Sequence, residues 1–499
     1  MKKTIKDYLL SFILCFAFLG VLACSSDKDN TPVSIKMLSV NKDKVDFDSK
    51  ENTIEVTVNS NGVAWTLTNP VTWIKVNQTS GPSGSTVVKI TALENTTSSV
   101  RNAVITLSGS EVPSATISVS QAAAVATSLY PSYNTNPIAA DASGMSSSAV
   151  ELAAKIKLGW NIGNTLEATG GETAWGNPKV TKALIDAVKA NGFNAIRIPC
   201  SWNQNLENAA TAKIKTDWLN RVKEVVQYCV DNDMYVVVNI HWDGGWLENN
   251  INEAKKVENN AKQKAFWEQI ATHLRGFDEH LLFASANEPA VEDATQMAVL
   301  MSYHQTFIDA VRSTGGKNAN RVLVVQGPTT DIEKTNKLMT TLPTDKTANK
   351  MMVEVHYYSP WNFAGLTKDE TWGKMFYYWG SGFHSTTDTE RNATWGEEAD
   401  LEKNFKLMKT QFVDKGIPVL LGEFGAIRRT TLTGDALTLH LNSRAYYLKT
   451  VVKTAKANGL LPFYWDEGSL GNNGFGIINR TNNTVFDTQA LNALIDGLK

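Results

Sequence analysis

Two segments of the chain, HLLFASANEP at 280–289 and IPVLLGEFG at 417–425, share one pattern in which a short apolar run leads to a glutamate. Each run is too short for a buried helix and is rich in residues that favour β-structure, which predicts a strand buried in a parallel sheet. Glu288 and Glu423 then stand at the carboxyl ends of their strands. Catalytic groups gather at that edge in α/β proteins, so the pair predicts an acid–base site there.

Similar apolar runs alternate with helix-like segments throughout residues 148–499. The predicted strands lie at 156–161, 193–199, 234–241, 281–287, 321–327, 351–358, 417–423 and 460–467, and helices are expected over 179–190, 216–231 and 260–277, among others. Eight strands with helices between them predict an α/β fold of the (β/α)8, or TIM-barrel, type with enlarged loops. An open, doubly wound sheet is the alternative, but the sequence lacks the glycine-rich phosphate turn that such a sheet carries after its first strand.

The 499 residues exceed one compact core of usual size, so more than one domain is expected. Residues 36–122 contain strand-like segments at 53–60, 85–93, 102–109 and 115–121 and no helical period, which predicts a small all-β, immunoglobulin-like sandwich. Residues 123–147 are rich in Ala, Ser, Thr, Asn and Pro, and we interpret them as a linker to the barrel at 148–499.

The N-terminus has the pattern of a signal peptide. Residues 1–23 begin with three lysines, continue with an apolar region and end in Val-Leu-Ala directly before Cys24. The polar stretch after Cys24 favours lipidation of that cysteine and a flexible tether over 24–35. An ordinary signal peptide and a transmembrane anchor are the alternatives, although the apolar run is short for a spanning helix. We therefore expect a protein anchored by lipid to the outer membrane, at the cell surface.

Charge and cysteine content exclude several classes of function. The formal net charge is −2 and becomes −4 when signal removal takes away three lysines and Asp7, so nothing remains that would attract nucleic acid. Of the four cysteines, Cys200 and Cys229 remain in the folded part, either bridged or as two buried thiols. No CxxC or His-rich spacing is present, so neither a metal nor another cofactor is expected.

Polar residues follow most of the predicted barrel strands and would meet at one mouth of the barrel. In chain order they are Asn161, Arg197, His241, Asn287 with Glu288, His356 with Tyr358, Glu423 and Trp465. Each alone has an ordinary structural explanation, such as an ion pair for Arg197 or a satisfied buried histidine for His241. Together they form a cleft with two acids, a cation, imidazoles, a phenol and a flat ring, which suits hydrolysis of a glycosidic bond with retention.

Ordered motifs extend this pattern to a family resemblance over essentially all of 148–499. They are GWNIGNTLEA (159–168), ETAWGNP (172–178), FNAIRIPCSW (193–202), NIHWDGGW (239–246), ANEP (286–289), VHYYSP (355–360), LLGEFGA (420–426) and PFYWDEG (462–468). The region resembles glycoside hydrolase family 5, and within it the endo-β-1,4-glucanases and xyloglucanases. Residues 36–122, with Trp65, Trp73 and a closing ISVSQ, resemble the BACON domain found before surface glycosidases. The name of that domain suggests carbohydrate binding, but the two tryptophans are interpreted as packing residues rather than sugar platforms, and the domain as a spacer.

The resemblance implies a role for each strand-end residue. Glu288 of the NEP motif corresponds to the acid/base and Glu423 of the GEFG motif to the nucleophile. The residues that correspond to their surroundings are Arg197, His241, Asn287, His356, Tyr358 and Trp465. We expect Arg197 and Tyr358 to keep the pKa of Glu423 low, and the charge of Glu423 to raise the pKa of Glu288. Asn287 is expected to bind the sugar 2-hydroxyl and Trp465 to support the sugar ring.

Other acids and aromatic residues compete for roles in the cleft. Asp243, Glu398, Asp466 and Glu467 lie in or near predicted loops but lack the strand-end motif, so they are weak rivals for the catalytic pair. The loop tryptophans are candidates for sugar subsites or for loop packing: Trp175, Trp246, Trp361, Trp372, Trp379 and Trp395. Trp242, where many relatives carry a histidine, either adds a stacking surface or fills the barrel mouth. The aromatic loop 359–396 is expected to shape the plus side of the cleft.

The predicted function is a retaining endo-β-1,4-glucanase that cleaves a plant cell-wall polysaccharide at the cell surface. Branched xyloglucan is the first choice of substrate, cellulose derivatives and mixed-linkage β-glucan come next, and mannan is less favoured. The expected partners are this polysaccharide and, through the anchor, the membrane, and a monomer is expected. An inactive surface glycan-binding lipoprotein and a glycosidase acting on chain ends are the alternatives. The intact Glu288 and Glu423 argue against the inactive binder.

Overall fold

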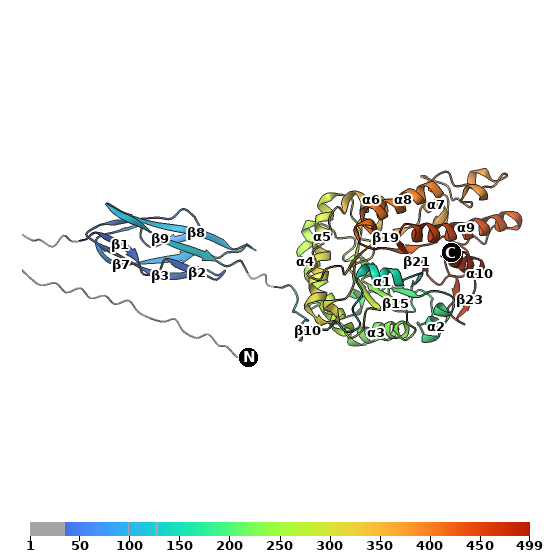
Figure 1. Cartoon of the computed structure of the whole chain (residues 1–499), viewed down its shortest axis with the longest axis horizontal. Helices are drawn as coiled ribbons and strands as arrows, with labels where there is room; N and C mark the ends of the chain where they lie inside the picture. Colours follow the sequence, from blue (N-terminus) through green and yellow to red (C-terminus); the bar gives the residue numbers. More distant parts are fainter. Residues whose placement is uncertain (1–34, 98, 125–127) are drawn as a thin grey trace, which may run out of the picture. The chain divides into compact units, whose positions relative to one another are not determined.

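The computed structural model describes residues 35–97, 99–124 and 128–499 (Figure 1). Contacts between residues divide the chain into two compact units that meet in sequence between Thr127 and Ser128. The predicted signal peptide, Cys24 and nearly all of the predicted tether lie outside the described residues. Within the described ranges, no helix combines the length and the apolar character that crossing a bilayer requires.

The first unit is a sandwich of two β-sheets, as the sequence predicts. One sheet has the strand order β1-β3-β7-β5 and the other β2-β9-β8-β4-β6, and all pairs are antiparallel except β2 with β9. The strands are β1 (Met37–Val40), β2 (Lys44–Phe47), β3 (Asn52–Asn61), β4 (Trp65–Thr68), β5 (Ile74–Val76), β6 (Ser80–Gly81), β7 (Gly84–Ala92), β8 (Arg101–Gly109) and β9 (Val112–Gln121). Trp65 lies in the core between the sheets, and Trp73 packs under the Arg101 guanidinium. Both indoles therefore serve packing.

The second unit is a closed barrel of eight parallel strands, which confirms the predicted fold. The strands are β11 (Gly159–Ile162), β12 (Ala195–Ile198), β15 (Tyr235–Asn239), β16 (Leu281–Ala284), β18 (Leu323–Gln326), β19 (Met351–Tyr357), β20 (Val419–Phe424) and β21 (Leu460–Asp466). Each overlaps one predicted segment, and β21 pairs with β11 to close the ring. No residue in these strands is exposed, which explains why they appear in the sequence as continuous apolar runs.

Helices surround the barrel and pack their apolar faces against it (Figure 1). They are α2 (Lys182–Ala190), α3 (Thr216–Val230), α4 (Glu253–Leu274), α5 (Ala294–Ser313), α6 (Ile332–Leu338), α8 (Glu398–Gln411), α9 (Gly434–Ala457) and α10 (Thr488–Asp496), and the short α7 (Trp361–Ala364) lies in the loop after β19. Short strand pairs in the loops are β13 (Leu206–Asn208) with β14 (Lys213–Ile214) and β22 (Ile478–Asn479) with β23 (Thr484–Val485). Helix α4 begins earlier than predicted because the Asn252 side chain caps a polar first turn.

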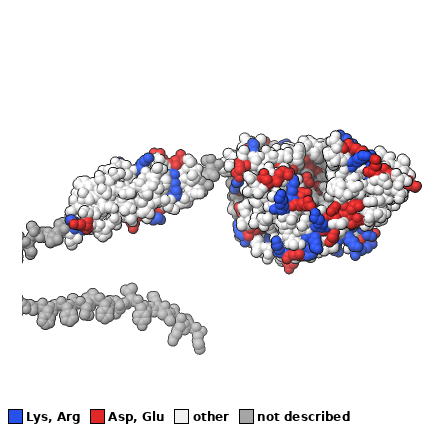
Figure 2. Space-filling view, turned by 90° about the horizontal axis from the view of Figure 1, so that it is seen from above, with Lys and Arg blue, Asp and Glu red and all other residues white. Residues whose placement is uncertain are grey.

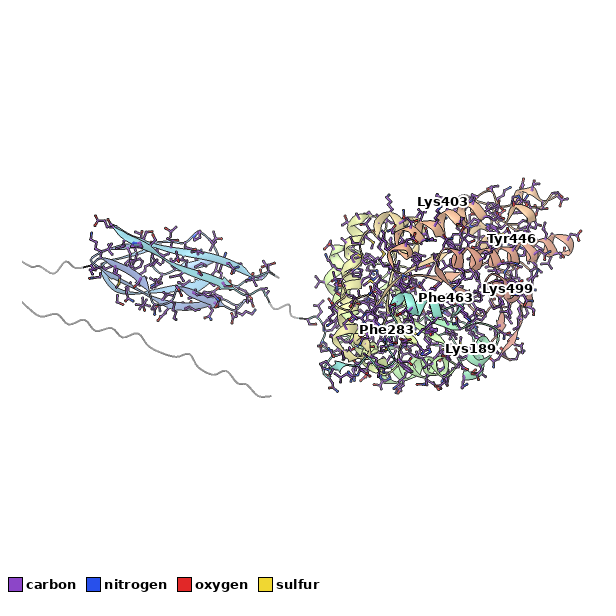
Figure 3. All side chains as sticks on the ribbon, viewed as in Figure 1. Lys189, Phe283, Lys403, Tyr446, Phe463 and Lys499 are labelled. Carbon is purple, nitrogen blue, oxygen red and sulfur yellow. The ribbon has the colours of Figure 1, made fainter. Side chains whose placement is uncertain are left out.

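An apolar cluster fills the amino-terminal part of the barrel interior and closes that end. Helix α1 (Ala149–Lys155), which is capped by Ser148 and Glu151, contributes Leu152 to this cluster. Phe463 belongs to the same cluster and lies beside α1 in Figure 3. Its ring requires Gly159 on the neighbouring strand, since a Cβ there would lie 2.0 Å from it. The amino-terminal part of the barrel is therefore closely packed.

Residues 128–147, which the sequence predicts to be part of a linker, belong to the barrel unit and are hydrogen-bonded to it. Glu268 on α4 is buried and accepts hydrogen bonds from Ser132 Oγ (3.1 Å) and the Tyr133 backbone N–H (2.7 Å). Further along, β10 (Ile138–Ala140) pairs with β17 (Gly315–Gly316). A polar segment without apolar periodicity resembles a linker in sequence because its partners lie far away along the chain.

The two cysteines of the barrel, Cys200 and Cys229, are buried free thiols, and the alternative that they form a bridge is wrong. The visible face of the barrel unit carries acidic and basic side chains side by side, in keeping with the small net charge (Figure 2).

Candidate active site

The polar side chains predicted for the strand ends come together at the carboxyl end of the barrel. In the space-filling view the barrel unit is hollowed, and acidic side chains lie within the hollow (Figure 2). Glu288 follows β16, the fourth barrel strand, and Glu423 lies in β20, the seventh. The order predicted from the sequence therefore places both acids in one cleft.

Glu423, the predicted nucleophile, is buried and held through both carboxylate oxygens. Arg197 donates from Nη1 to Oε1 over 2.8 Å, and the Tyr358 hydroxyl donates to Oε2 over 3.0 Å. Burial raises the pKa of Tyr358 well above its usual value, so the phenol remains a donor. These two contacts fix the direction of the carboxylate and supply positive potential to it.

Arg197 also organises the amides around the pair. Its Nη1 donates to Asn161 Oδ1 (3.0 Å) and its Nη2 to Asn287 Oδ1 (2.7 Å). Asn161 in turn donates to the Gly422 carbonyl, next to Glu423. Because the Asn287 oxygen is bound by the guanidinium, its amide NH2 is the end that can donate to a sugar hydroxyl.

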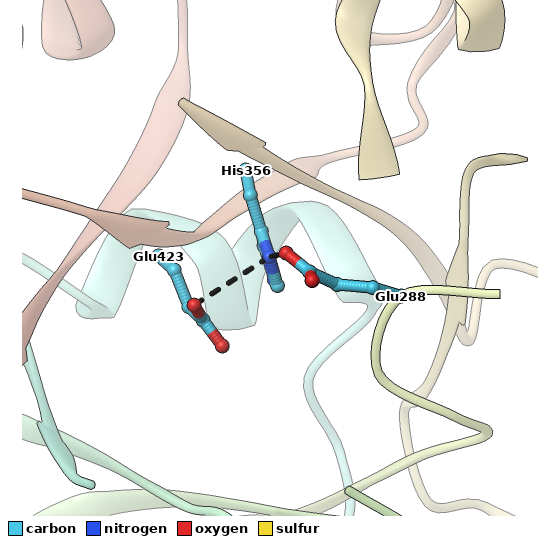
Figure 4. Close-up of side chains that lie close together, drawn as sticks. All are labelled: Glu288, His356 and Glu423. Atoms are coloured by element: carbon cyan, nitrogen blue, oxygen red, sulfur yellow. Dashed lines mark hydrogen bonds and ion pairs between the residues drawn. The ribbon is translucent and has the colours of Figure 1, made fainter. Parts of the chain in front are cut away.

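Glu288, the predicted acid/base, is the more accessible of the two acids, with 43% of its side chain exposed. Its Oε1 lies 2.7 Å from His356 Nδ1 and 3.5 Å from the Thr330 hydroxyl. The same imidazole nitrogen lies 3.7 Å from Glu423 Oε2 (Figure 4). His356 thus stands between the two carboxylates.

The separation of the two carboxylates indicates the stereochemical course. One carboxylate oxygen of Glu288, one of Glu423 and one ring nitrogen of His356 all lie within 4.8 Å of one another. Retaining glycosidases hold their carboxyl groups about 5 Å apart, whereas inverting enzymes need about 6.5–9.5 Å to admit a water. The short separation leaves no room for that water and favours direct attack by one carboxylate.

The protonation pattern differs from the sequence-based expectation. Burial lowers the pKa of His356, but Glu423, Glu288 and Glu354 outweigh burial and raise this pKa to about 10. Burial raises the pKa of Glu288, yet the hydrogen bond and charge of His356 outweigh it, so this pKa is lowered. At Glu423 burial prevails and the pKa is raised. Without substrate, the expected order of the two pKa values, with Glu288 above Glu423, is therefore wrong. The reason is that a charged His356 stabilises the Glu288 anion.

The aromatic candidates have different roles. Trp465 stacks against the His241 ring at 5.9 Å, and burial with the nearby Arg197 keeps the pKa of His241 well below its usual range. Trp361 stands edge-on to Tyr358, and it is partly exposed, as is Trp242. Trp246 donates to Asp243 and packs against Phe266 and Lys262 of α4, so it supports its loop. Trp175, Trp372 and Trp395 are exposed, whereas Trp379 is fully buried and serves packing.

The rival carboxylates organise loops. Asp243 accepts from the Asn203 N–H, Asp466 from the Ile477 N–H, and Glu467 from the Phe475 N–H. Glu398 begins α8 and accepts from the Ser381 N–H. Each has hydrogen-bond partners in the loops of the barrel, which accounts for its presence without a catalytic role.

Sequence reasoning missed two buried carboxylates that touch this site. Glu354 on β19 contacts both His356 and Arg197. Glu248 accepts from the backbone N–H groups of Glu288 (3.0 Å) and Trp242 (3.1 Å), and burial raises its pKa to about 7. Trp242 has a φ of 35°, a strained backbone that this hydrogen bond helps to hold. Only Glu354 had a signal in the sequence, since it lies two residues before His356 on the same strand face.

A barrel that brings two carboxylates this close, one clamped by arginine and tyrosine and one paired with histidine, has the site of a retaining glycoside hydrolase. The cellulase family model (glycosyl hydrolase family 5) matches residues 161–471, and the BACON model matches 63–122. The chain belongs to glycosyl hydrolase family 5, as the sequence resemblance predicts.

Several known proteins are similar to this chain over most of their length. A xyloglucan-specific endo-beta-1,4-glucanase of Bacteroides ovatus is 34% identical over 525 residues, which cover 100% of this chain and 99% of that protein. Endoglucanase A of Paenibacillus barcinonensis is 37% identical over 399 residues, which cover 75% of this chain and 96% of that protein. The structure of a Bacteroides ovatus GH5 xyloglucanase in complex with a XXXG heptasaccharide has a TM-score of 0.69 and 33% identity, and the match covers 93% of this chain and 100% of that one.

Proposed function

We propose that the protein is a retaining endo-β-1,4-glucanase that cleaves xyloglucan, with Glu423 as nucleophile and Glu288 as acid/base. The observation that carries this proposal is the close approach of the two carboxylates, each with its own set of partners. The relatives named above, among them a xyloglucan-specific endo-beta-1,4-glucanase that matches over the full chain, support the choice of reaction and substrate.

In the first step a Glu423 oxygen attacks the anomeric carbon while Glu288 gives a proton to the departing sugar oxygen. In the second step Glu288 takes a proton from the water that hydrolyses the glycosyl ester. Glu423 must be ionised for attack, and Arg197 and Tyr358 each donate a hydrogen bond to that anion. The Asn287 amide donates to the 2-hydroxyl, a contact that strengthens as the ring approaches an oxocarbenium ion.

Substrate binding supplies the pKa change that Glu288 needs. Its half-exposed side chain loses water when a sugar covers it, and the loss of hydration raises the pKa of a carboxyl group. The proton shared with His356 over 2.7 Å then moves to the carboxylate. The raised pKa of His356, about 10, means that this proton is present throughout the neutral range.

A pocket of 550 Å³ beside the acid/base suits a branched substrate. It lies between α6, the loop after β19 and α8, and its lining includes Asp331, His356, Tyr358, Trp361, Trp395 and Asp400. Trp361 and Trp395 expose 46% and 49% of their surface, which provides flat apolar faces beside carboxylates, as sugar binding requires. The pocket follows the fifth and sixth strands, next to the fourth strand that leads to Glu288. We therefore assign it to the leaving-group side, where a xylosyl branch enters.

The test compares products and substrates. Purified protein is incubated with xyloglucan, barley β-glucan and carboxymethyl-cellulose, and the products are separated by chromatography. We expect xyloglucan to be cleaved fastest and into oligosaccharides, and Glu423→Ala to abolish turnover. Early release of monosaccharides would instead identify an enzyme acting on chain ends, and glycan binding without cleavage by the wild type would identify a binder.

Variants of two exposed tryptophans test the branch pocket. Trp395→Ala should lower kcat/KM on xyloglucan more than on unbranched barley β-glucan, because only the branched chain fills the pocket. Trp372→Ala is the matched control, since Trp372 is exposed but does not line this pocket. Equal losses on both substrates in the Trp395 variant would assign the pocket to the main chain of the glycan.

We propose further that the protein is anchored by lipid on Cys24 at the outer cell surface. The sequence Val-Leu-Ala-Cys after an apolar run and the polar stretch that follows support this location. Expression with labelled palmitate should give a labelled protein, and Cys24→Ser should remove the label. Protease treatment of intact cells should release the activity, and an enzyme that stays protected would contradict a surface location.

A further inference from the structure

A third carboxylate lies beneath the catalytic pair, and the proposed mechanism does not use it. Glu354 is on β19 two residues before His356, so both side chains point into the barrel. It is fully buried, and a carboxylate at that depth is tolerated only when charged and hydrogen-bonding partners surround it. The site around Glu354 supplies such partners on three sides.

Glu354 touches both cations of the active site. Its Oε1 lies 3.2 Å from His356 Nε2 and 2.8 Å from Arg197 Nε, and its Oε2 accepts from Gln326 Nε2 over 2.6 Å. Gly422, which precedes Glu423 on β20, leaves the space, since a Cβ there would lie 2.0 Å from Glu354 Oε1. The lack of a side chain at this position of β20 therefore leaves the space that the Glu354 carboxylate occupies.

We infer that Glu354 is a positioning residue that holds the Nε2 proton of His356, so that the Nδ1 proton is the one exchanged with the acid/base. Both imidazole nitrogens face carboxylate oxygens, Nε2 towards Glu354 and Nδ1 towards Glu288. A neutral imidazole has one N–H and serves only one of them. With both protons present, His356 donates one hydrogen bond to Glu354 and one to Glu288. The contact with Glu354 retains the proton on Nε2 when the Nδ1 proton is transferred. The inference rests on the proposed retaining mechanism.

The proton balance is complete without any further reagent. As sugar covers Glu288, the His356 Nδ1–H bond breaks and the Glu288 Oε1–H bond forms, which neutralises both charges. That O–H bond then breaks as the leaving-group O–H forms, while the glycosidic C–O bond breaks and a bond forms between the anomeric carbon and a Glu423 oxygen. In the second step the water oxygen bonds to the anomeric carbon, the ester bond to Glu423 breaks, and Glu288 takes the proton from this water and returns it to Nδ1. The Nε2–H bond to Glu354 persists throughout, and it fixes the tautomer of the neutral imidazole.

The charges around His356 explain why Glu354 matters for its proton. The groups that face the imidazole are Glu354 on β19 itself, Glu288 after β16, Glu423 on β20, Arg197 on β12 and the neutral His241 after β15. Three carboxylates thus oppose two cations when His356 is charged. Without Glu354, two carboxylates remain and Arg197 loses one partner, so the imidazole binds its second proton less tightly.

The variant Glu354→Gln tests the inference with two substrates. On xyloglucan, whose leaving group needs a proton, kcat should fall on the order of 10²-fold. A 2,4-dinitrophenyl cellooligosaccharide has a leaving group that departs without protonation, and the variant should retain most of the wild-type rate of its first step. The basic limb of kcat/KM on xyloglucan should move to lower pH by about one unit. The reason is that activity is lost as pH rises through the pKa of the proton shared by His356 and Glu288, and the variant lowers this pKa. Equal losses on both substrates with an unshifted limb would overturn the inference.

Asp345→Asn is the matched control, since it breaks another buried ion pair, with Arg312, away from the cleft. It should lower Tm without changing the ratio of the two rates or the pH profile. If Glu354→Gln fails to fold, nitrogen NMR of the wild type decides. His356, assigned through His356→Gln, should show two protonated ring nitrogens at pH 7, and a single neutral tautomer would overturn the inference. An inactive wild type with the doubly protonated ring would refute the proposed function alone.

Discussion

The Tyr358 hydroxyl is one of two donors to the proposed nucleophile, and its removal gives a quantitative test of the site. In Tyr358→Phe the ring should stay in place, because it packs edge-on against Trp361 and Phe475. The variant loses the hydrogen bond of 3.0 Å to Glu423 Oε2. A hydrogen bond to a charged group contributes about 1.5–3 kcal/mol. The expected loss in kcat/KM is therefore about 10- to 150-fold.

The same variant should shift the acidic limb of the pH profile. The Tyr358 hydrogen bond lowers the pKa of Glu423, so its removal raises that pKa further above the usual value. As the proposed nucleophile, Glu423 would attack as an anion, so activity should be lost as pH falls through its pKa. The acidic limb of kcat/KM should therefore move to higher pH, whereas the basic limb, which reports the proton held by Glu288 and His356, should move less.

Initial rates on xyloglucan across the pH range measure both effects, and thermal unfolding checks the fold. Tyr303→Phe is the control: its phenol on α5 is buried and donates to the Asn250 carbonyl, so the variant loses stability without touching either catalytic acid. It should keep the wild-type pH profile. A loss below about twofold in Tyr358→Phe, less than a weak hydrogen bond supplies, would refute the role given to this contact. An acidic limb that stays in place would refute the electrostatic argument.

Three further predictions address the acid/base, the thiols and the domains. Glu288→Ala should lose on the order of 10²- to 10⁴-fold on xyloglucan, and added azide should restore turnover of an activated aryl glycoside as a β-glycosyl azide; absence of rescue would contradict the assignment. Cys200 and Cys229 are buried, and burial raises the pKa of both thiols, so a chain starting at residue 36 should react with a thiol reagent only after unfolding. Deletion of 36–122 should leave activity on soluble xyloglucan nearly intact, because the cleft residues all come from the second unit, and a large loss would contradict a spacer role.

The barrel was predictable because its strands are buried on both faces. Full burial turns each strand into an uninterrupted apolar run, and the polar residue that ends the run marks the barrel mouth. Arg197, Glu423 and Trp465 were found in this way, and the structure places all three around one cleft. Strand order also needed only the sequence, because consecutive parallel strands in such a barrel are neighbours.

Residues whose role depends on a distant partner were not predictable. Ser132 and Tyr133 lie in a segment with linker composition, yet they bind Glu268, which lies far along the chain. Trp246 and Trp379 lie in loops, as sugar-binding tryptophans do, and only their packing distinguishes them from Trp395. Composition describes what a residue is able to contact, whereas burial and partners arise from the folded chain.

The reversal of the two carboxyl pKa values shows how finely such a site depends on distance. The sequence identifies the same charges that the structure contains, but it cannot rank their separations. His356 Nδ1 lies 2.7 Å from Glu288 and 3.7 Å from Glu423, and only the shorter contact is a hydrogen bond. The hydrogen bond adds to the charge interaction at Glu288 and lowers its pKa, whereas at Glu423 burial outweighs the charge of His356. We expect a sugar that covers Glu288 to remove its water and to favour the protonated acid, so that the order of pKa values required by the proposed mechanism arises with substrate in place.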